Sequence, residues 1–126
     1  MRSRQLLKPY FDKKYGKVTA ANSSQITDGA ALLMFANKQT IKKYDLPVLA
    51  KVVDIEWAAL SPKTMGLGPV HAATPLMLRH QLTFDSLDYM EINEAFAAQV
   101  LGCVEAWKDK KYCTENLGLE GAFGEL

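Results

Sequence analysis

The feature that most constrains the fold is a strand pattern that passes directly into a helix pattern near the C-terminal end. Residues 87–92 alternate between apolar and polar side chains, as a strand does. Residues 93–108 then place Phe96, Val100, Val104 and Trp107 three or four positions apart, the spacing of a helix. A strand followed by a helix through a short link is typical of layered α/β folds.

The middle of the chain extends this alternation. Residues 48–57 are rich in β-branched side chains and predict a strand. Residues 38–44 predict a short surface helix that ends at Asp45-Leu46-Pro47. Residues 30–36 are apolar at every position and fit either a buried strand or a buried helix.

Loops and helix ends are marked by small and polar residues. Residues 18–29 predict an ordered loop, and residues 61–69, with two prolines and two glycines, predict a turn. A helix follows that begins either near Pro69 or at Thr74 as N-cap, and runs to about His80. Beyond Lys108 the periodicity weakens, so we expect a loop.

These elements predict an α/β fold with short, mostly parallel strands covered by helices. A parallel sheet needs cover on both faces. Two or three strands with helices on one side do not supply that cover, so we expect partner strands from outside this chain.

Charge and composition narrow the function classes. With 48% hydrophobic and 23% charged residues the chain has a globular composition, and its net charge of +1 argues against a nucleic-acid binder. Residues 1–17, by contrast, hold six basic residues and one acidic residue. This lead-in is either a solvated face or a surface for a phosphate-bearing ligand.

Cysteine and histidine positions give little chemistry by themselves. His71, His80, Cys103 and Cys113 are too far apart in sequence for a zinc site, so we expect no metal. Cys103 lies on the apolar helix stripe and suits core packing, whereas Cys113 lies in a polar stretch and could be exposed. Two cysteines do not form a disulfide scaffold, and we expect a cytoplasmic protein without a signal peptide or a membrane span.

Asn93 is the position that best suits a ligand site. It lies where the predicted strand ends and the helix begins, the place where α/β folds bind ligands. Its amide either caps the helix or reaches into a cleft, and the spacing leaves both readings open.

Three sequence blocks resemble motifs of the thiolases, and they follow one another along the chain in the order that thiolases have them. Asn93-Glu-Ala-Phe-Ala-Ala-Gln99 is similar to their NEAF(A/S)AQ segment. Val18-Thr-Ala-Ala-Asn-Ser-Ser24, which continues to Asp28-Gly29, is similar to the VTA(G/A)N(A/S)S loop, and Met65-Gly-Leu-Gly-Pro69 to the MGxGP turn. Lys8-Pro-Tyr-Phe11 also matches the (K/R)PxF pattern found upstream.

The resemblance implies acyl transfer between coenzyme A thioesters, by thiolysis of a 3-ketoacyl-CoA or by Claisen condensation, with no further cofactor. Asn93 would hold a water that hydrogen-bonds the thioester oxygen. Phe96 would line the pantetheine tunnel, Met65 the acyl side, and Ser24 would hydrogen-bond the pantetheine arm. The basic lead-in would then lie near the phosphates of coenzyme A.

The same resemblance divides the chain into three parts. Residues 1–24 correspond to the end of a CoA-binding loop domain, 25–46 to the end of the thiolase N-terminal half, and 47–126 to the first part of the C-terminal domain. The acylated cysteine and the GHP histidine of thiolases have no counterpart in this sequence.

We therefore expect a thiolase-like fold fragment that is inactive alone. It would act in a homo-oligomer or with the missing thiolase segments. A non-catalytic remnant that serves as a folding, CoA-binding or partner-interaction module is the alternative.

Overall fold

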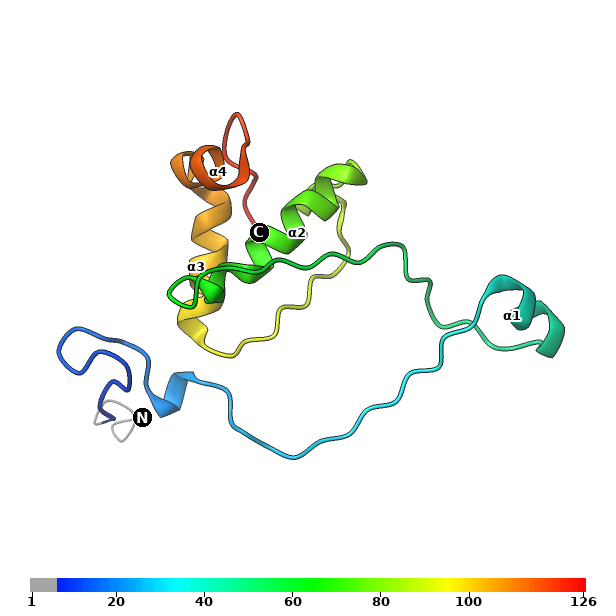
Figure 1. The fold of residues 1–126 in the computed structure, drawn as a ribbon, viewed down its shortest axis with the longest axis horizontal. Helices are drawn as coiled ribbons and strands as arrows, with labels where there is room; N and C mark the ends of the chain where they lie inside the picture. Colours follow the sequence, from blue (N-terminus) through cyan, green and yellow to red (C-terminus); the bar gives the residue numbers. More distant parts are fainter. Residues whose placement is uncertain (1–6) are drawn as a thin grey trace. The chain divides into compact units, whose positions relative to one another are not determined.

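Residues 7–126 are described by the computed structural model, and they fall into two units. The first joins the described residues up to Gln25 with Glu56–Leu126, and the second is Ile26–Ile55. The first unit contains three α-helices, α2 (Gly68–Arg79), α3 (Ala97–Lys108) and α4 (Lys110–Leu117) (Figure 1). It also contains three 3-10 turns, η2 (Ala20–Asn22), η3 (Met65–Leu67) and η4 (Phe84–Ser86).

Helix α2 starts at the earlier of the two predicted positions. Pro69 stands in its first turn, where the missing N–H costs no hydrogen bond. The alternative start at Thr74 is wrong, because Thr74 lies inside the helix and is only 1% exposed. Its hydroxyl accepts a hydrogen bond from Trp107 Nε1 at 3.0 Å. That tertiary contact accompanies a helix that continues through Pro75.

Helix α3 begins four residues later than predicted, and α4 replaces a predicted loop. Phe96 precedes α3 in an extended conformation, with φ −143°. Asp109 ends α3 and begins α4, where its carboxylate accepts hydrogen bonds from the Lys111 and Tyr112 amides at 2.8 and 3.2 Å. Gly118 closes α4 with a left-handed φ of 70°. An aspartate N-cap and a glycine nine positions later were the available signals for this helix.

A small core lies between these helices. Val70, Cys103, Ala106 and Trp107 are buried, and Trp107 meets the Phe84 ring edge-on at a centroid distance of 5.1 Å. Cys103 packs in the core as expected. The expectation of an exposed Cys113 is wrong, since this residue is fully buried on α4 and its Sγ donates to the Ala106 carbonyl at 3.2 Å.

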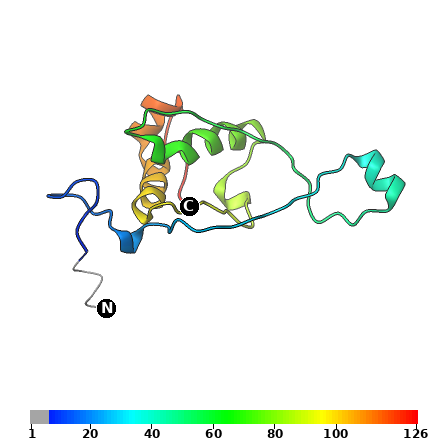
Figure 2. The ribbon, with the colours of Figure 1, turned by 60° about the horizontal axis from the view of Figure 1, so that its bottom comes forward.

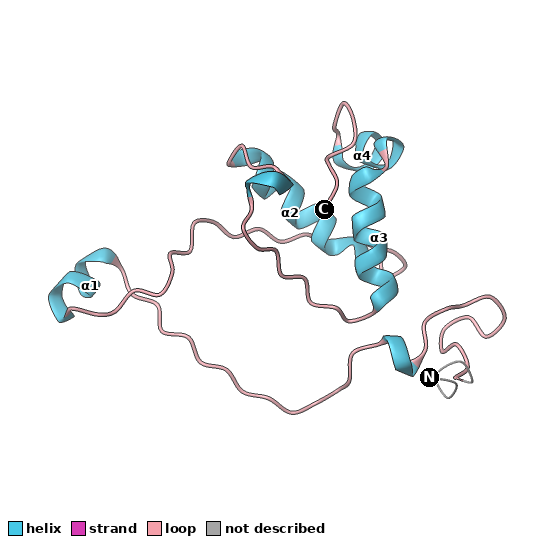
Figure 3. Ribbon diagram, turned by 180° about the vertical axis from the view of Figure 1, so that it is seen from behind, coloured by secondary structure: helices cyan, strands magenta, loops and turns pink. Residues whose placement is uncertain are grey.

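The predicted strands do not pair within the described residues. Figure 3 shows helices and loops but no strand in that part of the chain, and residues 48–57 and 87–92 do not form strands there. The one ladder-type contact found there is an isolated antiparallel bridge between Ser23 and Phe96. A strand pattern forms a strand only when another strand supplies its backbone hydrogen bonds.

The second unit contains helix α1 (Lys38–Tyr44), with the predicted bounds. Asn37 caps it by accepting a hydrogen bond from the Thr40 amide at 2.9 Å, and Asp45 ends it in the left-handed region. The apolar chain on both sides of α1 is exposed. Its exposed large side chains are Ile26, Leu32, Leu33, Met34, Phe35, Val48, Leu49, Val52, Val53 and Ile55.

Within residues 7–126, none of the helices is both long enough and apolar enough to span a bilayer.

Candidate functional site

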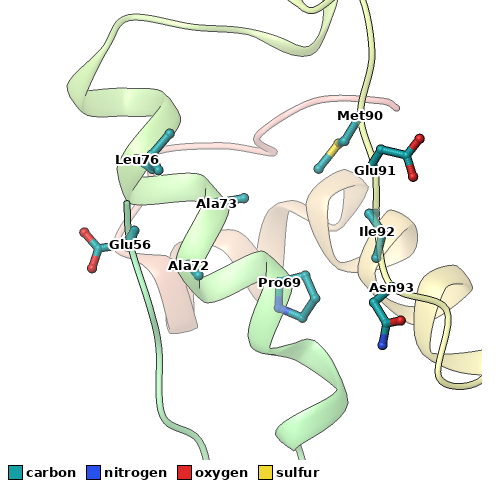
Figure 4. A pocket seen from close by; sticks show the side chains of 9 residues that line it. All are labelled: Glu56, Pro69, Ala72, Ala73, Leu76, Met90, Glu91, Ile92 and Asn93. Atoms are coloured by element: carbon teal, nitrogen blue, oxygen red, sulfur yellow. The ribbon is translucent and has the colours of Figure 1, made fainter. Parts of the chain in front are cut away.

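An open hollow of about 290 Å³ lies between α2 and the chain that leads into α3. Figure 4 shows α2 on one side of it and residues 90–93 on the other, with Glu56 at its edge. Figure 2 shows from a second direction how this connection links α2 to α3. The lining residues are Glu56, Pro69, Ala72, Ala73, Leu76, Met90, Glu91, Ile92 and Asn93.

The hollow combines an apolar wall with a few polar groups. Alanine, leucine, proline, methionine and isoleucine form most of the wall. Glu56 is held at one edge by an ion pair with Arg79, at 2.9 Å. The lining includes a carboxamide and two carboxylates but no thiol, imidazole or hydroxyl group. An apolar wall with a few polar groups is the usual composition of a small-molecule binding site.

Asn93 contributes the carboxamide, and the structure excludes one of the two roles left open for it. The N-cap of α3 is Phe96, and no side-chain hydrogen bond holds the start of that helix. The N-cap reading of Asn93 is therefore wrong. Asn93 is exposed and lines the hollow opposite Pro69, as Figure 4 shows.

Ser24 lies next to the segment that carries Asn93. Its backbone N–H donates to the Ala95 carbonyl at 2.8 Å, and the neighbouring Ser23 forms the isolated bridge with Phe96. The Ser24 hydroxyl makes only a long contact, 3.4 Å, with the Gln25 carbonyl. The structure thus brings together two of the predicted site segments, which lie about seventy positions apart in sequence.

Phe96 has an aromatic partner that the sequence analysis did not single out. The Phe11 ring meets the Phe96 ring edge-on at 5.8 Å, and Tyr10 meets Phe11 at 5.2 Å. Phe11 remains 70% exposed. The (K/R)PxF match at residues 8–11 was the available signal, although it gave Phe11 no role.

Met65 stands on η3 with a side chain that is 69% exposed. It does not line the hollow, whereas Pro69, four positions later in the same motif, does. The turn itself packs on α3, because Cys103 Sγ donates to the Gly66 carbonyl at 3.4 Å. The third predicted segment therefore joins the other two through α3.

The side chains of Cys103, His71 and Tyr112 are buried or held in structural contacts. Burial raises the pKa of the Cys103 thiol, which opposes formation of the thiolate that a nucleophile needs. His71 Nε2 pairs with the Tyr112 hydroxyl at 2.9 Å, which is a structural contact between α2 and α4. Burial likewise raises the pKa of the Tyr112 hydroxyl.

The described part of the basic lead-in is a solvated surface. Lys8, Lys13, Lys14 and Lys17 are exposed, and Lys14 Nζ lies 4.8 Å from the centroid of the Tyr15 ring. Arg2 and Arg4 lie outside the described residues. These exposed ammonium groups are compatible with either interpretation of the lead-in, a solvated face or a surface for a phosphate-bearing ligand.

Comparison with known proteins follows the same motifs. The thiolase C-terminal domain model matches residues 46–122, and the thiolase N-terminal domain model matches residues 3–39. The chain is 45% identical over 98 residues to a peroxisomal 3-ketoacyl-CoA thiolase of Encephalitozoon cuniculi, covering 78% of this chain and 25% of the relative. It is 38% identical over 122 residues to the 3-ketoacyl-CoA thiolase of Pseudoalteromonas translucida, covering 95% of this chain and 28% of the relative.

Solved structures agree with the sequence relatives. The dimeric peroxisomal thiolase of Saccharomyces cerevisiae matches with a TM-score of 0.76 at 36% identity, over 82% of this chain and 26% of that one. The acetyl-CoA acetyltransferase of Syntrophomonas wolfei matches with a TM-score of 0.71 at 35% identity, over 98% and 29%. The predicted thiolase-like α/β fold class is confirmed, and the chain spans about a quarter of the length of these relatives. From its three motifs, its domain matches and its fold, this chain belongs to the thiolase family.

Proposed function

We propose that this chain works as one segment of a thiolase that transfers acyl groups between coenzyme A thioesters. The observation that carries the proposal is the convergence of three motif segments on α3. Ser24 is hydrogen-bonded to Ala95, the Met65 turn packs on α3, and Asn93 lines the hollow. The reaction is thiolysis of a 3-ketoacyl-CoA or the reverse condensation.

In this proposal Asn93 supplies electrostatic help rather than a covalent bond. Its exposed carboxamide holds a water that hydrogen-bonds the thioester oxygen as negative charge develops there. The nucleophilic thiol comes from thiolase segments outside this chain, because both of its own cysteines are buried. The acyl-enzyme chemistry therefore requires association with those segments or with further copies of the protein.

The ligand contacts follow from the same arrangement. Phe96, with Phe11 against it, forms the apolar wall for the pantetheine arm, and the Ser24 hydroxyl hydrogen-bonds that arm. Met65 lines the acyl side. The exposed lysines of residues 8–17 attract the phosphates of coenzyme A. The bound molecules are thus coenzyme A and acyl-CoA.

We propose a cytoplasmic location or, for a eukaryotic source, the mitochondrial matrix or the peroxisome. Two of the relatives are named peroxisomal, which is compatible with the last of these.

Turnover of a 3-ketoacyl-CoA by the chain together with the missing thiolase segments tests the proposal. We expect formation of acetyl-CoA with both parts present and none with the chain alone. Asn93→Ala should lower turnover by about 10²–10³-fold, as the loss of an oxyanion-hole donor does. Asn116→Ala removes an exposed amide from α4 and should leave turnover unchanged. No activity in the assembled protein would favour the alternative, a non-catalytic folding, CoA-binding or partner-interaction module.

A further inference from the structure

One face of α3 holds the η3 turn at three points. Cys103 Sγ donates to the Gly66 carbonyl at 3.4 Å. Gln99 Cγ lies 3.5 Å from the place where a Cβ on Gly66 would stand. Leu67 Cδ2 lies 3.6 Å from the corresponding place on Gly102, so the glycine leaves room for that leucine. Residues three and four positions apart share one helix face, so residues 99, 102 and 103 form one contact surface.

The amide group of Gln99 is in an unfavourable environment. Its Oε1 atom is buried and has no hydrogen-bond partner within the part of the chain that the structure describes. A buried acceptor without a partner is destabilising, and an apolar side chain of similar length would avoid the penalty. The part of Gln99 that lies beside Gly66 is its Cβ–Cγ stem, which an apolar side chain of similar length would keep.

The turn held in this way carries Met65. Met65 directly precedes Gly66 and projects a largely exposed side chain, so the position of the turn decides where that side chain stands. The same helix begins directly after the segment with Asn93 and Phe96. A short, continuous helix thus links the oxyanion side of the proposed site to its acyl side.

We infer that Gln99 and Cys103 are positioning residues that fix the Met65 turn and thereby set the acyl-chain length that the thiolase accepts. This inference rests on the proposed function, in which Met65 lines the acyl side. Neither residue touches the substrate. Each acts through Gly66, from opposite ends of one helical turn.

The first test measures the turn itself by amide hydrogen exchange in the full chain. The Leu67 amide donates to the Thr64 carbonyl at 2.9 Å, so its exchange reports opening of η3. Gln99→Ala and Cys103→Ala should each speed that exchange about 10-fold, because the packing on Gly66 is lost. Gln99→Met keeps the stem and should restore slow exchange. Glu105→Gln, at an exposed position of α3, is the matched control.

The second test measures selectivity in the enzyme assembled with the missing thiolase segments. The ratio of kcat/KM for a medium-chain to a short-chain 3-ketoacyl-CoA should change about 10-fold in the two alanine variants, mainly through KM. Their kcat on the short substrate should stay at the level of the unaltered enzyme. Gln99→Met and Glu105→Gln should keep the original ratio.

The outcomes separate the two ideas. Unchanged exchange in both alanine variants overturns the positioning role, and faster exchange with an unchanged ratio overturns the link to chain length. Absence of thiolysis with the unaltered chain refutes the proposed function and the selectivity claim, whereas the exchange result still decides whether α3 holds the turn. If Cys103→Ala loses helical circular dichroism, Cys103→Val, which keeps more of the side-chain volume and still removes the S–H donor, replaces it with the same expectation.

Discussion

The hydrogen bond between Trp107 and Thr74 should account for a measurable part of the stability of the helical core. Trp107 is fully buried and Thr74 is 1% exposed, and the indole N–H donates to the threonine hydroxyl at 3.0 Å. Thr74→Val keeps the shape of the side chain and removes the acceptor. The indole N–H is then buried without a partner, which should lower the free energy of unfolding by about 1–3 kcal/mol.

A second substitution, Trp107→Phe, separates the energy of this hydrogen bond from that of side-chain packing. In a Trp107→Phe background there is no indole N–H to leave unpaired, so the same Thr74→Val change should cost close to nothing. The threonine hydroxyl left alone in that background can donate to a backbone carbonyl one helical turn earlier. The double-mutant cycle should thus give a coupling energy of about 1–3 kcal/mol, because the loss of ring volume occurs on both arms and cancels.

Urea unfolding followed by far-ultraviolet circular dichroism is the suitable assay, since Trp107→Phe removes a fluorophore. A constant m-value across the four proteins would show that the same surface unfolds in each. Thr114→Val is the matched control: this hydroxyl is on exposed α4 surface and donates to the Lys110 carbonyl at 2.8 Å. Its effect should stay within about 0.5 kcal/mol. An equal cost of Thr74→Val in both backgrounds would refute the reasoning.

Two further predictions concern the C-terminal region. Gly118→Ala should destabilise the protein by about 1 kcal/mol, because Gly118 ends α4 at a φ of 70° that suits glycine; Gly118→Asn should cost less, and thermal unfolding of the two variants decides. The Lys108–Glu125 ion pair, 2.6 Å long, lowers the pKa of the Glu125 carboxyl below its ordinary value of 4.5 and raises the pKa of the Lys108 ammonium above 10.5. Its contribution should be present between those two values, fall as pH drops through the lowered pKa of Glu125, and fall as pH rises through the raised pKa of Lys108. Glu125→Gln should slightly reduce the change in the free energy of unfolding at both the acid and the alkaline end of a pH series, since the pair is on the surface. The same pH dependence in the two proteins would contradict this.

The elements with local signals could be predicted from the sequence. Helix α1 has its bounds fixed by Asn37 as N-cap and by Asp45 ahead of Pro47, which are contacts within a few positions of each other. A start of α2 at Pro69 was one of the two that local signals allowed. The choice against a start at Thr74 could not be made from the sequence, because Thr74 lies inside the helix and accepts a hydrogen bond from Trp107, thirty-three positions away.

The candidate site divides in the same way. Asn93, Ser24 and Phe96 were found from motif residues, and the structure places their segments side by side. The edge-on contact of Phe11 with Phe96 and the place of Gln99 beside Gly66 joined no predicted site, because each depends on parts of the chain that are distant in sequence.

The predicted strand segments do not form strands in this chain for a physical reason. A helix satisfies its own backbone, so the helices form within this chain, whereas a parallel strand needs a neighbour for its N–H and C=O groups. The exposed apolar runs beside α1, such as Leu32–Phe35, have side chains suited to a sheet covered on both faces. The segment spans about a quarter of each relative, and the remainder of a thiolase is where such neighbours would come from. The order that makes Asn93 useful is therefore expected to depend on pairing that joins this segment to the rest of a thiolase.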